Sequence, residues 1–198
     1  MTIAICTPTR DLVHAGFAFD LFNLANYHSH EYNLVFLVSK GTLLCNQRTD
    51  LVKQSLDMKA SYVLFIDSDM RFPVDTLRQL LHHNLNIVGA NCIQRGTDKS
   101  TAQNAKGFVS SKGATGIEEV EHLGFGVTLI ATDVFKKIPQ PWFATPYDGE
   151  HFVGEDIFFC HKAKECHFKI FIDHDLSKQI KHVGNYEYGM GSLNGSSL

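Results

Sequence analysis

The sequence lacks several features that would place it in other classes of protein. No window holds the ~18 consecutive apolar residues that a membrane span needs. The first ten residues have too short an apolar stretch, with no basic residues before it, for a signal peptide. No Lys/Arg-rich run is present, and 18 basic residues against 21 acidic ones give a net charge of -3. Tight non-specific binding of nucleic acid is therefore disfavoured.

Phosphate-binding and zinc-binding signatures are also missing. There is no Gly-x-Gly-x-x-Gly and no Gly-Lys-Ser/Thr, which excludes a Rossmann dinucleotide site and a phosphate loop. The 5 cysteines are odd in number and scattered. Two Cys-His dipeptides, at 160–161 and 166–167, lack the second Cys-x-x-Cys pair of a zinc knuckle. We expect a reduced, cytoplasmic protein without a membrane span.

What is present is enough for one α/β domain. The 198 residues are 44% hydrophobic, which suffices for a real core. In the first half, apolar patterns predict strands at 2–6, 32–39, 62–66 and 86–92, and helices at 17–27, 46–58 and from Pro73. That alternation implies parallel strands joined by right-handed crossovers. The second half is mixed, with a loop at 96–116, a strand pair within 118–130, helices at 132–138 and 155–164, and a strand at 169–173.

The most informative stretch is the apolar strand Tyr62–Ile66, which ends in Asp67, Ser68 and Asp69. Such a continuous run is typical of a strand buried on both faces, and α/β sheets bind ligands at the carboxyl ends of their strands. Two ionised aspartates there would repel each other unless a positive group lay beside them. A divalent cation carrying phosphates suits them, because Mg²⁺ and Mn²⁺ prefer hard oxygen ligands. The alternative is a polar turn after a core strand.

The first loop lies at the same edge of the predicted sheet. It contains Thr7, Pro8, Thr9 and Arg10, whose hydroxyl, backbone N–H and guanidinium groups could hold a base or phosphates. The alternative is a simple turn that contains proline.

The segments around the paired aspartates resemble a known family. Asn46 and Arg48 lead the helix before the Asp-x-Asp strand, and 88–95 supplies a further strand and an Arg-bearing loop. In this order and spacing the motifs resemble the nucleotide-sugar half of GT-A-fold glycosyltransferases, over a match from Ile3 to about Gly184. The resemblance implies a Rossmann-related α/β sandwich, with a mostly parallel central sheet flanked by helices and a smaller mixed C-terminal half. Residues 1–184 would be one catalytic domain, divided into a nucleotide-sugar half (1–95) and an acceptor half (96–184), and 185–198 a flexible tail.

The same resemblance implies a donor site and a metal site. The residues expected to contact the nucleotide sugar are Thr7, Pro8, Thr9, Arg10, Arg48, Asp67, Ser68 and Arg95. Asp67, Asp69 and His182 would hold Mn²⁺ (or Mg²⁺), with Asp69 as the direct ligand and Asp67 shared with the ribose or a metal-bound water. An imidazole ligand favours Mn²⁺. The cation would stabilise the charge that develops on the leaving nucleoside diphosphate. The alternative for His182 is one of 11 histidines on the surface.

Catalysis is expected from Glu155 and Asp156, which open the helix at 155–164. By resemblance, Asp156 is the base on the acceptor hydroxyl, or orients it, with Glu155 as the second choice. The alternative is an ordinary acidic cap on a helix, whose dipole would hold the pKa of the base down. Gly124-Phe125-Gly126 and Trp142 are candidates for the acceptor side, against the alternative of a packed aromatic.

The predicted function is a metal-dependent glycosyltransferase that moves a hexose from a nucleotide diphosphate sugar, most simply UDP-linked, to a hydroxyl acceptor. A nucleotidyltransferase would carry a Gly-rich, basic loop after the first strand, which 7–16 lacks. A haloacid-dehalogenase-type phosphatase would have its Asp-x-Asp after the first strand. A non-catalytic nucleotide-sugar-binding module stays open because 198 residues leave little room for an acceptor domain. The donor, the acceptor, the stereochemistry and the oligomeric state are not fixed by the sequence.

Overall fold

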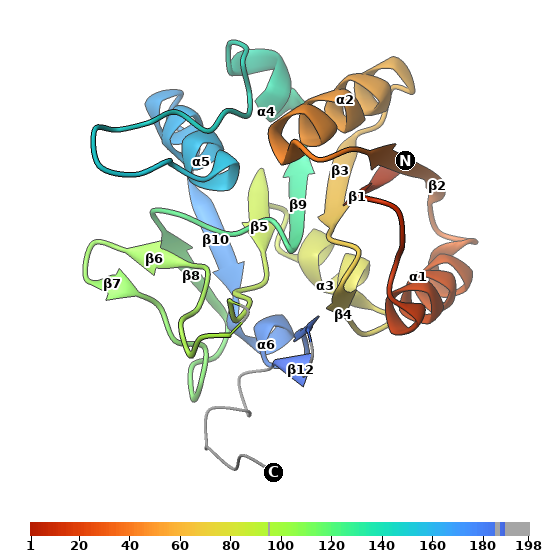
Figure 1. Cartoon of the computed structure of the whole chain (residues 1–198). Helices are drawn as coiled ribbons and strands as arrows, with labels where there is room; N and C mark the ends of the chain where they lie inside the picture. Colours follow the sequence, from red (N-terminus) through yellow and green to blue (C-terminus); the bar gives the residue numbers. More distant parts are fainter. Residues whose placement is uncertain (95, 185–186, 189–198) are drawn as a thin grey trace.

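The protein is a mixed α/β structure built on one seven-stranded sheet (Figure 1). The computed structural model describes residues 1–94, 96–184 and 187–188. The strand order is β2-β1-β3-β9-β5-β10-β8. In that order the strands are β2 (Asn33–Lys40), β1 (Thr2–Thr9), β3 (Tyr62–Ile66), β9 (Val127–Ala131), β5 (Ile87–Gly89), β10 (Ile170–Asp173) and β8 (Ile117–Val120). This confirms the predicted α/β class.

The sheet is parallel in its main direction but carries two reversed strands. β1 pairs in parallel with β2 and β3, and β10 pairs in parallel with β5. β9 lies antiparallel between β3 and β5, and β8 lies antiparallel to β10. The sequence predicts a strand pair within 118–130, yet β8 and β9 take places far apart in the sheet. An apolar pattern identifies a strand, whereas its partners depend on the rest of the fold.

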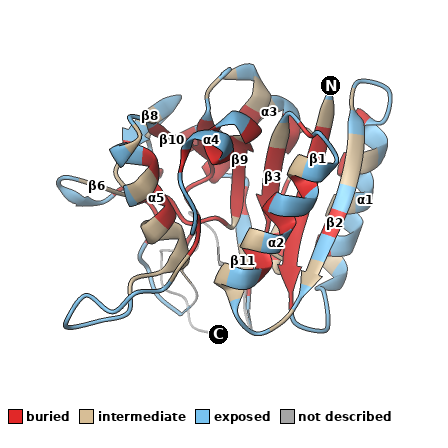
Figure 2. Cartoon of the chain, turned by 90° about the horizontal axis from the view of Figure 1, so that it is seen from above, coloured by how far each residue is buried: buried red, intermediate tan, exposed pale blue. Residues whose placement is uncertain are grey.

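Helices cover both faces of the sheet and enclose two apolar clusters. α2 (Leu44–Asp57), α4 (Thr132–Lys137) and α5 (Glu155–Glu165) pack on one face. α1 (Ala15–His28), α3 (Thr76–His82) and α6 (His174–Ser177) pack on the other. Burial is deepest in the central strands β1, β3 and β9, whereas β2 and the outer side of α1 stay largely exposed at one end (Figure 2). Within the described residues, no helix is long and apolar enough to cross a membrane.

Two small sheets complete the structure. β4 (Met70–Arg71), β11 (Lys181–Val183) and β12 (Glu187–Tyr188) form one, in the order β12-β11-β4. β6 (Gln103–Asn104) and β7 (Gly107–Phe108) form a hairpin inside the segment that the sequence predicts as a loop. β12 falls within the predicted tail. The other tail residues, 185–186 and 189–198, lie outside the described residues.

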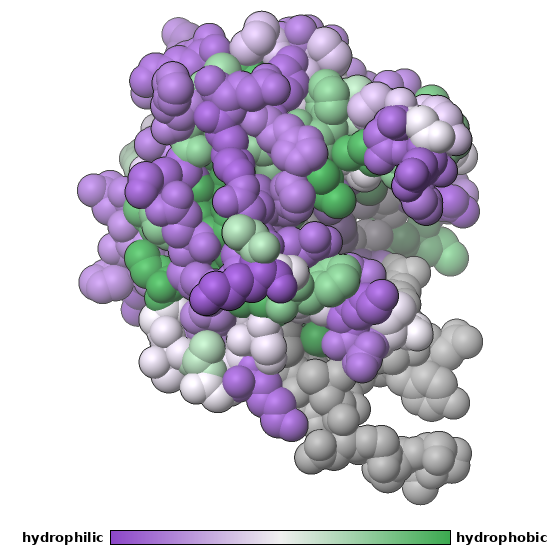
Figure 3. Space-filling model, turned by 90° about the vertical axis from the view of Figure 1, so that its left-hand side faces the viewer, coloured by the Kyte–Doolittle hydropathy of each residue, from purple (hydrophilic) through white to green (hydrophobic). Residues whose placement is uncertain are grey.

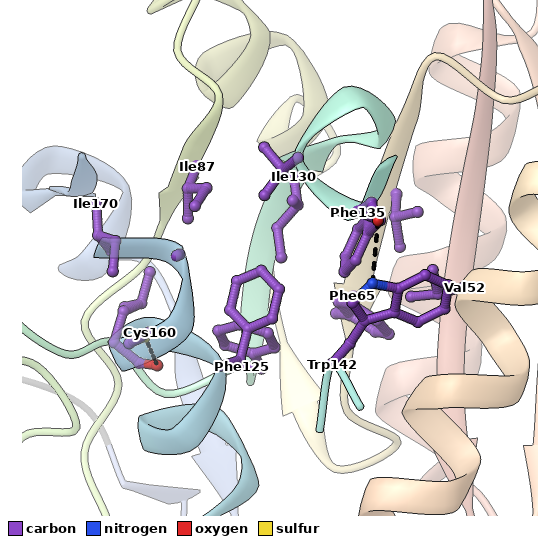
Figure 4. Packing of buried hydrophobic residues seen from close by; sticks show 14 of the residues in the cluster. Val52, Phe65, Ile87, Phe125, Ile130, Phe135, Trp142, Cys160 and Ile170 are labelled. Carbon is purple, nitrogen blue, oxygen red and sulfur yellow. Dashed lines mark hydrogen bonds between the residues drawn. The ribbon is translucent and has the colours of Figure 1, made fainter. Parts of the chain in front are cut away.

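Trp142 belongs to the core and not to a sugar-binding surface. Its side chain is only 5% exposed, and its Nε1–H donates to the carbonyl oxygens of Phe135 and Ile138 at 3.0 Å each (Figure 4). Phe125 is also buried, stacked against Phe65. The predicted role of these aromatic residues on the acceptor side is therefore wrong. An indole has a large apolar surface, and its burial in the core stabilises the fold. Sequence spacing alone does not distinguish a core tryptophan from one that binds a sugar.

Glycine at position 124 is also explained by packing. A Cβ atom there would lie 2.6 Å from the Cβ of Thr101, closer than real side chains approach. The glycine therefore admits a neighbouring side chain, and its predicted role of admitting a sugar is not needed to explain it.

Candidate functional site

The candidate site is a cavity at the carboxyl ends of β1 and β3. Its volume is about 930 Å³. The strand β3 is buried on both faces and ends at Ile66. Asp67 follows directly, and its backbone N–H donates to the Gly126 carbonyl oxygen. The cavity lining includes seven residues that the sequence predicts: Pro8, Thr9, Arg10, Asp67, Ser68, Asp69 and His182. Parallel strands thus bring Pro8, Thr9 and Arg10 to one edge with the paired aspartates, as predicted. The prediction that the chain forms a loop from Thr7 onward is wrong, because β1 continues through Thr9 by pairing with β2.

Asp69 and His182 are brought together by a short antiparallel pairing. β4 starts directly after Asp69 and pairs with β11, where His182 stands opposite Met70. The Val183 N–H donates to the backbone oxygen of Asp69 at 2.8 Å, which fixes the register. As a result, His182 Nε2 lies 3.4 Å from Asp69 Oδ2. This pairing joins residues that are far apart in the sequence.

The orientation of the His182 ring determines which nitrogen faces the carboxylate. Nδ1 lies 3.0 Å from the carbonyl oxygen of Ile93, which can only accept, so Nδ1 carries a proton. In the neutral ring, Nε2 then carries the lone pair and points to Asp69. Two acceptors that face each other in this way attract a proton or a metal cation between them. A ring fixed by a hydrogen bond from its other nitrogen is the usual arrangement of a metal-binding histidine.

Asp67 takes part in a different interaction. The Nη2 of Arg48 donates to Asp67 Oδ1 at 3.0 Å, while its Nε donates to Glu155 Oε1 at 3.1 Å. The guanidinium lies over the rings of Phe65 and Phe125, 5.1 and 5.4 Å from their centroids. Burial raises the pKa of Asp67, and the nearby Arg48 lowers it without cancelling the effect of burial.

Arg48 lies below the cavity and joins the two halves of the chain. Its side chain is 2% exposed and is not among the cavity-lining residues. It comes from α2 in the first half and holds Glu155 of α5 in the second. Its Nη1 atom is buried and has no hydrogen-bond partner among the described residues. The structure therefore places Arg48 as a support for both carboxylates.

The carboxyl group of Asp156 has a raised pKa. It is the second residue of α5, and its Oδ1 accepts from the Ile157 N–H at 2.8 Å. Burial raises the pKa of Asp156 to about 6, with a further contribution from the adjacent Glu155. The sequence-based expectation that the helix dipole would keep this pKa low is wrong. Desolvation outweighs the dipole because the carboxyl is partly buried.

Four predicted site residues, Thr7, Arg48, Glu155 and Asp156, are not among the residues that line the cavity. Thr7 is buried beside α1 and lines a different groove. Arg95 lies outside the described residues. The described residues contain no group of three or more His, Cys, Asp and Glu side chains that could hold a metal ion. Asp67, Asp69 and His182 are thus not gathered as one set: Asp67 is turned to Arg48, and Asp69 faces His182.

Gln47 is a residue of the site that sequence reasoning missed. Its Nε2 donates to the backbone oxygens of Thr9 and Ser39, at 2.6 Å each, and it also lines the cavity. It therefore ties together the carboxyl ends of β1 and β2. Its position one turn before the buried Leu51 would have indicated an inward-facing side chain.

A second missed feature anchors the segment after Asp69. The Nε of Arg71 donates to Asp20 Oδ2 at 2.6 Å, and the Phe72 N–H donates to the same oxygen at 3.1 Å. Asp20 comes from α1, so this helix helps to fix β4 and, through it, the place of Asp69.

Comparisons with known proteins give a likeness of fold. No protein-family profile and no curated protein matches the sequence. Among solved structures, the chain is similar to protein A197 from STIV, with a TM-score of 0.67 and 18% identity over 93% of this chain and 86% of that one. At this identity the likeness shows the fold alone.

Two transferase structures are similar more loosely. One is a glycosyltransferase involved in the glycosylation of the major capsid of PBCV-1, with a TM-score of 0.40 and 14% identity over 87% of this chain and 92% of that one. The other, from Desulfovibrio desulfuricans G20, is assigned as a nucleotide-diphospho-sugar transferase, with a TM-score of 0.43 and 9% identity over 86% and 78%. Both scores are below 0.5, so we base nothing on them.

Proposed function

We propose that the protein is a metal-dependent glycosyltransferase that uses a nucleotide diphosphate sugar, most simply a UDP-linked hexose. The observation that carries the proposal is the Asp69–His182 pair beside the cavity at the carboxyl edge of β3. An imidazole nitrogen with a directed lone pair and a carboxylate oxygen form a donor set that suits Mn²⁺ better than Mg²⁺. The residues present therefore fit the cation, with Asp69 and His182 as its protein ligands.

The donor would lie in the cavity of about 930 Å³, which is of the size that holds a drug-sized ligand. Pro8, Thr9 and Arg10 border it on one side, and Asp67 and Ser68 on the other. A bound Mn²⁺ supplies Lewis-acid stabilisation to the departing diphosphate. Asp67, held by Arg48, is proposed on the ribose side or near a cation-bound water and not as a direct ligand.

Asp156 is the proposed base. With a pKa of about 6 it is mostly ionised at pH 7 and above, yet basic enough to take a proton from an acceptor hydroxyl as the bond forms. Glu155 is fixed by Arg48 and ranks second, as a group that orients the acceptor. The hexose, the hydroxyl acceptor and the contact from Arg95 rest on the family resemblance and stay predictions.

The experiment is a thermal-shift panel with UDP, GDP, CMP and ATP, each with and without Mn²⁺. We expect UDP or GDP with Mn²⁺ to raise the melting temperature, since a ligand that binds only the folded state stabilises it. Asp69→Ala should abolish the Mn²⁺-dependent shift, and His182→Ala should weaken it. Asp133→Ala, at an exposed carboxylate on α4, is the matched control and should leave the shift intact. No shift with any nucleotide and Mn²⁺, or equal shifts in all variants, would contradict the proposal.

A non-catalytic nucleotide-sugar-binding module is the second candidate. The observation in its favour is that Trp142 and Phe125, expected on the acceptor side, are core residues. This candidate predicts the same Mn²⁺-dependent shift but no release of nucleoside diphosphate, with or without added hydroxyl acceptors. Release that depends on Asp156 would exclude it.

A further inference from the structure

An apolar groove lies between α1 and β2, at the end of the sheet away from α5. We name it the α1–β2 groove; its volume is about 380 Å³. Its main lining residues are Val13, Leu21, Phe22, Phe36 and Val38, and no charged residue lines it. The opposite end of the molecule, over α5 and the β6–β7 hairpin, is mostly hydrophilic (Figure 3). Exposed apolar side chains occur at that end as well, Phe108 on β7 and Phe152 before α5.

The floor of the groove is formed by Phe36 and Val38 of β2, and it stays exposed because α1 packs over the inner strands instead. β2 is the terminal strand of the sheet, so only β1 pairs with it in the described structure. Leu37 faces the core under α2, and the alternation of a strand turns Phe36 and Val38 to the other face. α1 buries Phe17 and Leu24 against the inner strands, which leaves Phe36 44% and Val38 57% exposed.

The wall of the groove carries a ridge of exposed aromatic side chains. Phe19 is 69% exposed and Phe22 is 62% exposed. The two lie three residues apart on α1, so they are neighbours on the helix surface. Large apolar side chains that cluster on a surface mark a site of association. The ridge and the floor thus form one continuous apolar surface.

We propose that a second copy of this chain covers the α1–β2 groove in a twofold dimer, with the Phe19–Phe22 ridge of each copy over the Phe36–Val38 floor of the other. The ridge and floor lie on adjacent elements of the same chain, as a self-complementary contact requires. One twofold axis would then bury both surfaces in both copies.

The area available is what a modest dimer needs. At ~200 Å² for a whole aromatic side chain, Phe19, Phe22 and Phe36 alone expose about 350 Å² per copy, or about 700 Å² in two. Val13 and Val38, which line the groove and are 44% and 57% exposed, bring the total to about the 1,000 Å² that a specific interface exceeds. We therefore expect dissociation in the micromolar range. An anionic membrane is a weaker candidate, because no Lys or Arg lines the groove to meet the headgroups.

Sedimentation velocity of the full chain between about 1 and 100 μM tests the proposal. We expect the wild type to shift from monomer to dimer across this range, and the double variant Phe19→Glu/Phe22→Glu to stay monomeric throughout. Tyr147→Glu/Phe152→Glu is the matched control: it adds the same two charges at aromatic side chains that are 60% and 77% exposed, on the loop before α5, and should dimerise like the wild type. Circular dichroism checks that each variant is folded. If the double variant does not fold, Val38→Lys on β2 replaces it.

Two outcomes would overturn the dimer. The first is a wild type that stays monomeric at 100 μM, including the case in which it instead binds phosphatidylcholine vesicles through Phe22. The second is a folded double variant that dimerises as strongly as the wild type. Val13 lines both the groove and the donor cavity, but the substituted residues Phe19, Phe22 and Val38 do not line the cavity. The two experiments can therefore fail independently.

Discussion

Replacing Arg48 by methionine should destabilise the protein more than almost any other single change at the site. The guanidinium is 2% exposed and is hydrogen-bonded to Asp67 and Glu155, whose side chains are 30% and 12% exposed. Methionine keeps an apolar stem against Phe65 but removes the guanidinium to which both carboxylates are hydrogen-bonded. Breaking a buried ion pair from one side costs about 3–5 kcal/mol, because the remaining charge stays buried without a partner.

The sign of the pH dependence follows from the carboxylates. Burial already raises the pKa of Asp67 in the wild type, and Arg48 opposes that rise. Without Arg48, the pKa of Asp67 moves further up. A carboxyl with a raised pKa in the folded state stabilises the fold below its unfolded pKa of about 4, and that stability is lost as the pH rises through the folded value. The penalty of Arg48→Met should therefore be smaller at pH 5 than at pH 8.

Urea denaturation of both proteins at pH 5 and pH 8 measures this difference. The control is Arg78→Met, which removes an exposed guanidinium that contacts Glu31 and lies over Tyr27, and should change the stability little at both pH values. A loss below about 1 kcal/mol for Arg48→Met at pH 8, or a loss of equal size at both pH values, would refute the reasoning. The first result would mean that the carboxylates find other partners, and the second that the effect is one of packing.

Two further predictions concern the proposed base and a tight packing contact. Asp156→Asn should lower turnover about 10²- to 10⁴-fold with little change in donor affinity. In the wild type, kcat/KM should rise with pH through about 6 as Asp156 ionises, measured as release of nucleoside diphosphate. Gly89→Ala should cost about 1–3 kcal/mol in urea denaturation, because its Cβ would lie 2.7 Å from the Val127 oxygen. Gly41→Ala, whose Cβ would be 3.5 Å from its nearest neighbour on Gln47, is its control and should be nearly neutral.

The first half of the fold follows closely from the sequence because its signals are local. β3 begins and ends at the predicted residues 62 and 66, and α1 and α2 extend the predicted helices by one or two residues at most ends. Pro73 precedes α3, where its carbonyl oxygen accepts from the Thr76 hydroxyl. In this half each strand is continuous and each helix has an apolar stripe, so the local pattern is sufficient.

The second half shows where local patterns fail. β4 and β11 are two and three residues long, too short to produce a periodic signal, yet their pairing brings His182 to Asp69. β9 likewise lies between β3 and β5, which are far from it in the sequence, so a local pattern does not predict this pairing. The likeness of the motifs to a family placed His182 at the site, whereas hydrophobic periodicity had no means to do so.

The carboxylates around Arg48 differ in their partners, and the sequence alone does not show which partner each one has. Four carboxylates lie near one edge of the sheet, and Arg48 is hydrogen-bonded to only two of them, Asp67 and Glu155. Asp156 escapes part of the repulsion by binding a proton up to about pH 6. Asp69 lies beside a histidine whose Nδ1 is already committed to a carbonyl oxygen. A cation is thus favoured at Asp69 and less at Asp67, because Arg48 already supplies positive charge there. The two aspartates of one short motif therefore have unequal roles, and an Asp67→Asn variant should keep most of the Mn²⁺-dependent shift that Asp69→Ala loses.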